Sequence, residues 1–459
     1  MASEEGIIAD IKAWYLNKYE NNQVLTVFLT GMFLMMAIVA ILSLFTGGDA
    51  FIYGNLHPME SYWFMDHFSM VADSYENPYT KHGEIYPPLG ICLYAIIAFL
   101  TVPMVSYSGS SWDLALAMRD APGPMAVFVT LIIALIISFY MVYKKYAEKD
   151  LGHVGYNMVF ISLLFSYPVV FGISTGNYIF LSVLCCILYI YAYDSDDKRV
   201  RYFAYICLGV AAGLKITPAF LAVLTLKRKG WLELSKCVVI VSAILLVPFI
   251  FTDGDPIWYV RHVIEYASSV PASFGFLNIN DILDALGLSI YAALGVEVIV
   301  LGIVLLFILM DDEMERWEEA TILGCLLMLI FSVSVSYTLL YLEIGLMLLL
   351  TTHKKFTDKG MMLCLICFIG IFCLMPGFEH AQKYVGTIKA ILMLVLLFYI
   401  FGKSAIRMYK RFKEPKKEPE IKSPPKKVET KKTYSKNKVN KSNRKSDGNE
   451  KNNRVPRRS

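Results

Sequence analysis

The chain contains many apolar runs of about 20 residues, and this feature limits its fold more than any other. An α-helix rises about 1.5 Å per residue, so about 20 apolar residues span the roughly 30 Å hydrocarbon core of a bilayer. One run is long enough for two short helices with a break near Ser336. The sequence therefore predicts an all-α, polytopic integral membrane protein with about 11–12 membrane helices. The runs are 24–46, 87–105, 125–143, 154–172, 177–193, 202–226, 232–251, 289–310, 320–351, 361–378 and 387–402.

Composition agrees with a membrane protein and disfavours a disulfide-rich secreted one. The 459 residues are 56% hydrophobic, with a mean hydropathy of +0.52. We expect no cleaved signal peptide, because residues 1–23 carry acidic side chains and lack a small-residue cleavage pattern. All nine cysteines fall inside the apolar runs, so no extracytoplasmic disulfide framework is expected.

The net charge of +4 conceals an asymmetry along the chain. From Lys403 to Ser459 there are 21 Lys and Arg against 6 Asp and Glu, interleaved with Pro, Ser and Asn. Such a segment cannot bury an apolar core, so we expect a disordered basic tail. The predicted regions are a cytoplasmic N-terminal segment at 1–23, a membrane domain at 24–402 and a cytoplasmic tail at 403–459.

The tail has two possible roles. It either only fixes the C-terminus in the cytoplasm or also binds anionic lipid headgroups. Nucleic acid is not expected as a partner, because neither aromatic residues nor a recognition fold accompany the charge.

Basic clusters near the ends of the runs predict which loops are cytoplasmic. The poorly basic loops 47–86 and 252–288 are expected to be extracytoplasmic. Strict alternation of crossings would place Lys144 and Lys145 outside the cell, so we favour re-entrant segments at 87–105 and 202–226, and full crossings are the alternative. The second would break within Gly213–Pro218. The clusters are Lys144–Lys149, Lys198–Arg201, Lys227–Lys229, Lys354–Lys359 and the tail.

Two charged residues are the main candidates for chemistry. Asp66, beside His67 in the first outer loop, is either a general base or an ordinary solvated carboxylate. Lys215 lies in an apolar run, where an ammonium is costly unless it has a partner or reaches water. It either binds an anionic lipid phosphate, or snorkels to an interface, or bonds to a carbonyl at a helix break. Glu343 is a second intramembrane charge and a possible partner of Lys215.

The outer loops show no clustered metal-ligand spacing. Asp253 and Asp255 flank Gly254 and superficially resemble a DxD pair, but we expect neither a metal nor another cofactor. The acidic residues between 311 and 319 are expected to form a solvated cytoplasmic loop.

The second outer loop contains two further candidates. Arg261 is suited to clamp a phosphate, and Trp258 is suited to stack on a sugar. The alternative is that residues 256–268 form an interfacial helix whose aromatic side chains lie at headgroup depth.

Short motifs occur in order between residues 66 and 218. They are the outer-loop Asp66, Pro78-Tyr79, Tyr86-Pro-Pro-Leu at the start of a helix, Gly176-Asn177, and Leu208-Gly-x4-Leu-Lys215-x2-Pro218. Together these motifs resemble the multi-pass GT-C glycosyltransferases, in particular the mannosyltransferase-like GT87 (DUF2029) family, which uses polyprenyl-phosphate sugars. The resemblance covers roughly residues 20–400.

The resemblance implies a GT-C-type fold and transfer of a sugar, most simply mannose, to an extracytoplasmic lipid- or glycan-linked acceptor. Asp66 would deprotonate the acceptor hydroxyl, and Lys215 would contact the donor phosphate. A lipid monophosphate leaves with its charge, so a lysine can replace a metal ion. Where the family often has Gly-Gln, this chain has Gly176-Asn177, which shortens the amide. The candidate substrate-binding residues are His67, Tyr86, Asn177 and Trp258.

Two other functions remain open from the sequence. A transporter or flippase of lipid-linked glycans would need charges along a path, and only Lys215 and Glu343 stand out. A polysaccharide polymerase or ligase with a diphosphate-linked donor would favour several outer-loop arginines. Arg261 is the clear one, joined by Arg119 if residues 106–124 are outside.

Overall fold

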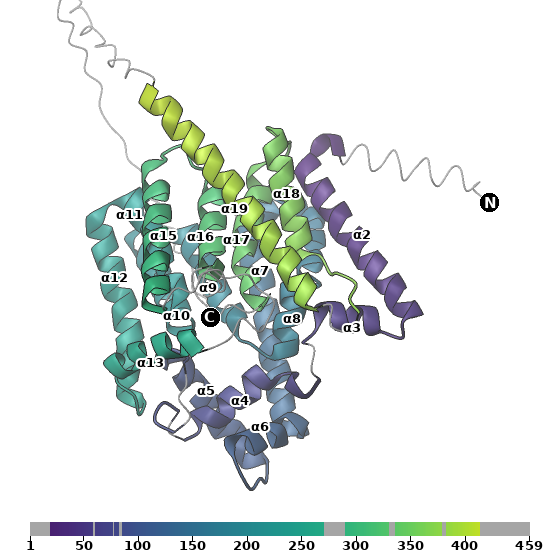
Figure 1. The fold of residues 1–459 in the computed structure, drawn as a ribbon, viewed down its shortest axis with the longest axis vertical. Coiled ribbons are helices and arrows are strands. Elements are labelled where there is room, and N and C mark those ends of the chain that lie inside the picture. The colour runs from purple at the N-terminus through teal and green to yellow at the C-terminus, as the bar shows by residue number, and fades with distance from the viewer. Residues whose placement is uncertain are drawn as a thin grey trace, which may run out of the picture. The chain divides into compact units, whose positions relative to one another are not determined.

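The computed structural model describes residues 19–57, 60–76, 78–81, 85–269, 290–329, 336–378 and 382–413, and all regular secondary structure in these ranges is helical (Figure 1). The prediction of an all-α polytopic membrane protein is therefore confirmed. The α-helices are α2 (Gln23–Phe45), α3 (Asp49–Asn55), α4 (Met65–Ser74), α5 (Pro88–Thr101), α6 (Ser111–Asp120), α7 (Pro122–Leu164), α8 (Tyr167–Thr175), α9 (Ile179–Ala192), α10 (Lys198–Leu214), α11 (Ala222–Lys229), α12 (Trp231–Leu246), α13 (Pro256–Ser269), α15 (Ile290–Met310), α16 (Arg316–Leu329), α17 (Leu342–Thr352), α18 (Lys359–Phe372) and α19 (Gln382–Lys413). The 3-10 helices are η1 (Glu60–Tyr62), η2 (Val102–Met104), η3 (Thr217–Leu221), η4 (Val247–Phe251) and η5 (Ser336–Tyr341).

The predicted apolar runs coincide with helices. Within the described ranges, α2, α7, α12 continued by η4, and α19 are long and apolar enough to cross a bilayer. Shorter apolar helices account for most of the other runs, and the run at 202–226 lies in α10, η3 and α11. The long run at 320–351 forms α16 and then, from Ser336, η5 and α17, as the expected break requires.

Helix α7 folds back on itself at Gly152. This residue has φ 73° and ψ 160°, a conformation that glycine adopts without the strain of a Cβ atom. The rings of Tyr140 and Tyr156 lie 5.4 Å apart, although 16 residues of straight helix would separate them by about 24 Å. The predicted runs at 125–143 and 154–172 are therefore antiparallel neighbours.

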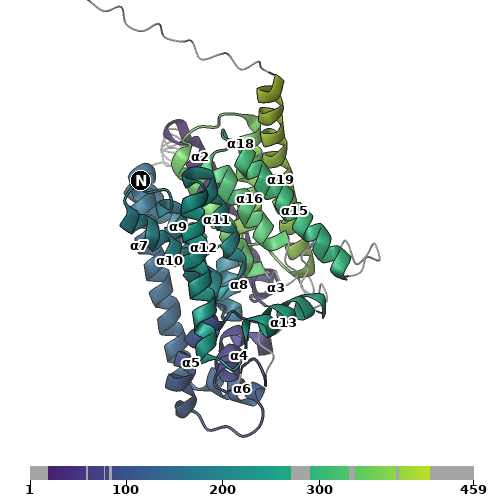
Figure 2. The ribbon, with the colours of Figure 1, turned by 90° about the vertical axis from the view of Figure 1, so that its left-hand side faces the viewer.

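Residues 198–229 enter and leave the helix bundle at the same end. Helix α10 stops before Lys215, whose φ of −147° and ψ of 121° are extended, and η3 and α11 lead back. Lys229 Nζ then lies 2.9 Å from Asp196 Oδ1, just before α10. Figure 2 shows α10, α11 and α12 together, and both α10 and α11 contact α12. The chain therefore breaks and turns back within Gly213–Pro218, as the prediction of a re-entrant 202–226 requires.

Helix α5 also stays at one end of the bundle. At its C-terminal end, the Thr101 hydroxyl lies 3.8 Å from the Met118 sulfur of α6. Helix α4 contacts both α5 and α6. These three helices lie together in both ribbon views (Figures 1 and 2). The arrangement supports a re-entrant 87–105 over a full crossing.

A network of buried ion pairs joins residues of α11, α16 and α19 with Asp311. Arg407 Nη2 lies 2.7 Å from Asp311 Oδ2 and 2.9 Å from Glu318 Oε2. Lys227 Nζ lies 2.6 Å from Glu319 Oε1. The pairs hold helices that are distant in sequence against one another.

The ion-pair network corrects one expectation, and the length of α19 refines another. Asp311, Glu318 and Glu319 are 2%, 0% and 1% exposed, so a fully solvated loop at 311–319 was the wrong prediction. They are buried because cations of other helices neutralise them. The predicted boundary at residue 402 falls inside α19, which runs to Lys413. Residues 1–18 and 414–459 lie outside the described part of the chain.

Candidate active site

The backbone between α8 and α9 brings the segment that carries Asp66 to the candidate site. Gly176 follows α8 with φ 81° and ψ 21°, the left-handed conformation that favours glycine after a helix. A Cβ atom there would lie 2.9 Å from the Phe64 carbonyl oxygen. The Phe64 N–H in turn donates to the Ser174 carbonyl at 2.7 Å. This close approach places Asp66, in the first turn of α4, against Asn177.

The Asn177 amide joins three polar groups. Its Nδ2 donates to Asp66 Oδ2 at 3.0 Å and to the Tyr86 hydroxyl at 2.9 Å. Its Oδ1 accepts the Ile179 N–H at 2.9 Å, at the start of α9. Asn177 is 1% exposed, so this orientation satisfies a buried amide from both of its ends.

Lys215 faces the same group from the break after α10. Its Nζ donates to the Tyr337 hydroxyl over 3.4 Å and lies 5.2 Å from the centre of the Tyr86 ring. Its charge also acts on Asp66. Tyr86, Asn177 and Lys215 line one small cavity whose other walls are mostly apolar. The fold thus brings together four of the predicted site residues, Asp66, Tyr86, Asn177 and Lys215.

The environment of Asp66 suits a base. Burial raises the pKa of its carboxyl group above the ordinary value, and this outweighs the lowering by Asn177, Lys215 and His57. A carboxylate with a raised pKa accepts a proton more readily. Asp66 combines this property with a fixed orientation.

His67 lies in an aromatic cluster and does not line the cavity formed by Tyr86, Asn177 and Lys215. It is 1% exposed, and the centres of the Phe68, Phe128 and Tyr178 rings lie 4.7, 4.8 and 5.0 Å from its own. Burial lowers the pKa of His67 to about 3, so the imidazole is neutral near pH 7. Its observed contacts are those of packing.

Two predicted site residues of α13, Trp258 and Arg261, lie apart from the group. The Trp258 ring packs edge-on against Tyr79, with centres 5.7 Å apart, and stacks on His262 at 4.7 Å. Arg261 is exposed on α13. Within the described ranges, neither Trp258 nor Arg261 makes a hydrogen bond or ring contact with Asp66, Tyr86, Asn177 or Lys215.

Tyr259, which the sequence did not single out, connects α13 to the site. Its hydroxyl donates to the Ile85 carbonyl at 3.0 Å. The Tyr79 hydroxyl similarly donates to the Tyr86 carbonyl at 2.8 Å. The two tyrosine rings lie 5.8 Å apart, so Tyr79 and Tyr259 together fix the segment that carries Tyr86.

Asp253 and Asp255 both accept hydrogen bonds from backbone N–H groups. Asp253 accepts the N–H groups of Tyr79 and Thr80 at 3.1 and 2.8 Å, and the Thr80 hydroxyl at 2.6 Å. Partial burial opposes these hydrogen bonds, which still hold the pKa of Asp253 below its ordinary value. Asp255 accepts two N–H groups in the first turn of α13. In the described part of the chain, no group of three His, Cys, Asp or Glu has metal-site geometry.

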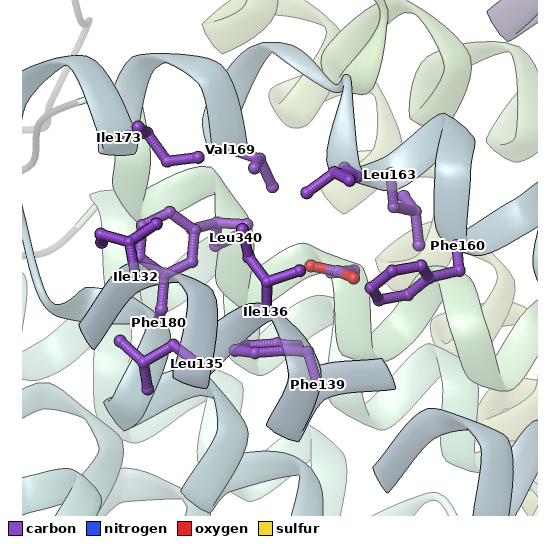
Figure 3. A pocket seen from close by; sticks show the side chains of 12 residues that line it. Ile132, Leu135, Ile136, Phe139, Phe160, Leu163, Val169, Ile173, Phe180 and Leu340 are labelled. Atoms are coloured by element: carbon purple, nitrogen blue, oxygen red, sulfur yellow. The ribbon is translucent and has the colours of Figure 1, made fainter. Parts of the chain in front are cut away.

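The hypothesis that Glu343 pairs with Lys215 is wrong. Glu343 is 4% exposed and lines an apolar pocket between α7, α8, α9 and α17. Figure 3 shows this pocket, with Ile132, Phe139 and Phe180 among its walls. The partners of Lys215 are instead the groups of the candidate site.

Sequence reasoning also missed Lys389, although it lies in an apolar run just as Lys215 does. Lys389 is 0% exposed. Its Nζ donates to three backbone carbonyls at the C-terminal end of α18, and it lies 4.2 Å from the centre of the Tyr167 ring. The position of a lysine within an apolar run was the available signal. The carbonyls are those of Gly370, Ile371 and Cys373, at 3.2, 2.8 and 2.9 Å.

Comparison with known proteins identifies one family. The model of glycosyltransferase family 87 matches residues 85–333. The matched range contains Tyr86, Asn177 and Lys215, and it begins after Asp66. Neither curated proteins nor solved structures gave a match.

Proposed function

The chain belongs to glycosyltransferase family 87 and is a membrane glycosyltransferase, and we propose that it uses a polyprenyl-phosphate sugar, most simply mannose, as its donor. The acceptor would be a lipid- or glycan-linked hydroxyl on the extracytoplasmic side. The observation that carries this proposal is the position of Asn177, which hydrogen-bonds to the Asp66 carboxylate and lines one cavity together with the partly exposed Lys215. Family membership also favours sugar transfer over the transporter alternative.

Asp66 would act on the acceptor. Asn177 occupies Oδ2 of the carboxylate, which leaves Oδ1 as the oxygen that takes the proton of the attacking hydroxyl. The acceptor oxygen then forms a bond to the anomeric carbon of the donor sugar. Removing a positioned general base costs a reaction about 10²–10⁴-fold in rate.

Lys215 would act on the donor. As the bond between the anomeric carbon and the phosphate oxygen breaks, its electron pair leaves with the lipid phosphate. The ammonium group of Lys215 would stabilise the charge on this phosphate, in a site partly shielded from water. Tyr86 and Tyr337, whose rings lie 5.2 and 5.0 Å from Nζ, would hold the ammonium in place.

The direct test is transfer of label from polyprenyl-phosphate [³H]mannose to membrane lipids and glycans by the purified protein. We expect transfer that survives excess EDTA, with Asp66→Asn protein as the background control. Transfer lost with EDTA and restored by Mn²⁺ would contradict the lysine-based mechanism. Transfer from a diphosphate-linked donor alone would favour the polymerase or ligase alternative.

Orientation is tested separately. Ser61 is exposed in the loop before α4, so a cysteine there should react with an impermeant thiol reagent in intact cells. A cysteine at Ser435 should react only after permeabilisation. Eight of the nine native cysteines are buried and Cys92 is partly buried, so their background should be low. The reverse pattern would place Asp66 in the cytoplasm and reject the proposal.

A further inference from the structure

A series of aromatic rings leads from the surface toward Asp66. The Trp112 and Tyr62 rings lie 5.6 Å apart, and those of Tyr62 and His57 lie 5.5 Å apart. Trp112 and Tyr62 are 41% and 44% exposed, whereas His57 is 9% exposed. His57 is close enough to Asp66 for their charges to interact. The series therefore begins at the exposed surface and ends at His57, one of the residues that act on the Asp66 carboxyl group.

Hydrogen bonds hold this aromatic series in place. Arg119 Nη1 on α6 donates to the Ser61 carbonyl at 2.8 Å, which joins the segment before α4 to the helix that carries Trp112. The Trp63 indole N–H donates to the His57 carbonyl at 3.0 Å. A surface fixed in this way can bind a ligand at little cost in ordering.

The charges around the series select the chemistry of its ligand. The two helices that carry Tyr62 and Trp112, η1 and α6, contain three acidic residues, Glu60, Asp113 and Asp120. Their one basic residue is Arg119, which pairs with Asp120 at 2.8 Å. This balance disfavours an anionic phosphate. A neutral sugar fits better, because its C–H face packs on aromatic rings while its hydroxyls hydrogen-bond to polar groups at the rim.

We propose that Trp112 and Tyr62 form an acceptor subsite that binds an uncharged sugar ring, so that the acceptor is a glycan rather than a phospholipid headgroup. The inference rests on the proposed function and deepens it, because it names the acceptor class. His57 continues the series from this subsite toward Asp66.

Kinetics with a defined acceptor test the subsite. With octyl mannobioside, Trp112→Ala and Tyr62→Ala should each raise the acceptor KM roughly 5- to 10-fold. The donor KM, kcat and detergent melting temperature should stay unchanged. Trp112→Phe keeps a ring and should recover part of the loss. Tyr107→Ala is the matched control, because Tyr107 is also 44% exposed and lies in the loop before α6 but outside the series.

Two kinetic outcomes would overturn the inference. If Tyr107→Ala raises the acceptor KM as much as Trp112→Ala, the exposed aromatic side chains act as membrane anchors. If the wild-type protein glycosylates phosphatidylglycerol but not octyl mannobioside, the acceptor class is wrong. Neither outcome would contradict glycosyl transfer itself.

A binding measurement separates this inference from the proposed function. In protein labelled with 5-fluorotryptophan, the ¹⁹F resonance of Trp112, assigned by its loss in Trp112→Phe, should shift on titration with methyl mannobioside. It should not shift with glycerol phosphate. A shift without any sugar transfer would support the subsite and reject the proposed donor chemistry. An unshifted resonance at saturating saccharide would overturn the subsite even if transfer occurs.

Discussion

Lys215 and Lys389 both lie in apolar runs, but their surroundings differ in the number of acceptors that the fold supplies. Lys389 is fully buried, and its ammonium group donates to three carbonyls at the C-terminal end of α18. Among the described residues, Lys215 makes one hydrogen bond, over 3.4 Å. Lys215 is also partly exposed and borders a cavity that it shares with Asn177.

This difference separates a structural lysine from one that can bind a ligand. An ammonium has three N–H donors, and the fold uses all three at Lys389. The last carbonyls of α18 lack partners within their own helix, so Lys389 satisfies them and complements the helix dipole. Lys215 retains donors and faces a carboxylate. An unsatisfied intramembrane cation beside a cavity is therefore the stronger functional candidate.

The largest effect is expected from the carboxylate that faces Lys215. Asp66→Asn nearly preserves shape and removes the base, so transfer should fall roughly 10²–10⁴-fold. Donor affinity should not fall, because the phosphate then meets Lys215 without a competing negative charge. Initial rates and equilibrium binding of polyprenyl-phosphate mannose measure the two quantities. Near-normal transfer by Asp66→Asn would remove Asp66 from the mechanism.

The same substitution at the two lysines should have opposite consequences. Lys215→Met removes the charge that meets the phosphate, so transfer should fall about 10²-fold while the melting temperature holds or rises. Lys389→Met leaves buried carbonyls without donors, at a cost of about 1–3 kcal/mol in folding free energy. It should lower the melting temperature and leave the transfer rate of the folded protein unchanged.

These two variants control for one another. Both replace a lysine in an apolar run by a side chain of similar length, so a general effect of lost charge would appear equally in both. Transfer rates normalised to folded protein, and melting curves in one detergent, give the comparison. It is contradicted if Lys215→Met destabilises the protein or if Lys389→Met stops transfer while the protein stays folded.

The sequence could identify Lys215 but not distinguish it from Lys389. The apolar runs located the helices, and the order of motifs singled out Asp66, Tyr86, Asn177 and Lys215, which the fold brings together. The acceptors of a lysine come from elements distant in the chain. The end of α18 satisfies Lys389, which no local pattern indicates.

Contacts between elements that are distant in the chain also explain the other differences between the sequence predictions and the structure. Asp311 and Glu318 look solvent-exposed in sequence, but Arg407, which lies beyond the predicted end of the membrane domain, neutralises both in the fold. His67 adjoins the proposed base, yet the pitch of α4 turns it into an aromatic cluster. Sequence adjacency therefore does not show which side chain joins the candidate site.

A smaller effect is expected from the hydroxyl that positions Lys215. Tyr337→Phe keeps the ring below the ammonium but removes a hydrogen bond, whose net value is about 0.5–1.5 kcal/mol. The bond is long, so donor KM should rise only about 2- to 5-fold. Tyr167→Phe is the control, because the Tyr167 hydroxyl bonds to Ser336 and its ring packs beneath Lys389. A larger change in donor KM for Tyr167→Phe would contradict the assignment.

The smallest effect is a shift of the acidic limb of the pH–rate profile. A base works only when deprotonated, so transfer should fall as the pH decreases through the pKa of Asp66. Burial raises this pKa above the ordinary value near 3.8, so the limb should lie at higher pH than for a solvated aspartate. Single-turnover rates across the acidic range measure its position.

The two lysines should affect that limb differently. The positive charge of Lys215 lowers the pKa of Asp66, whereas Lys389 is not among the groups that act on it. Lys215→Met removes the lowering influence, so the residual activity should be lost at a higher pH than in the wild-type protein. Lys389→Met should leave the limb in place. A limb that moves to lower pH in Lys215→Met, or equally in both variants, would show that Asp66 and Lys215 do not form one electrostatic unit.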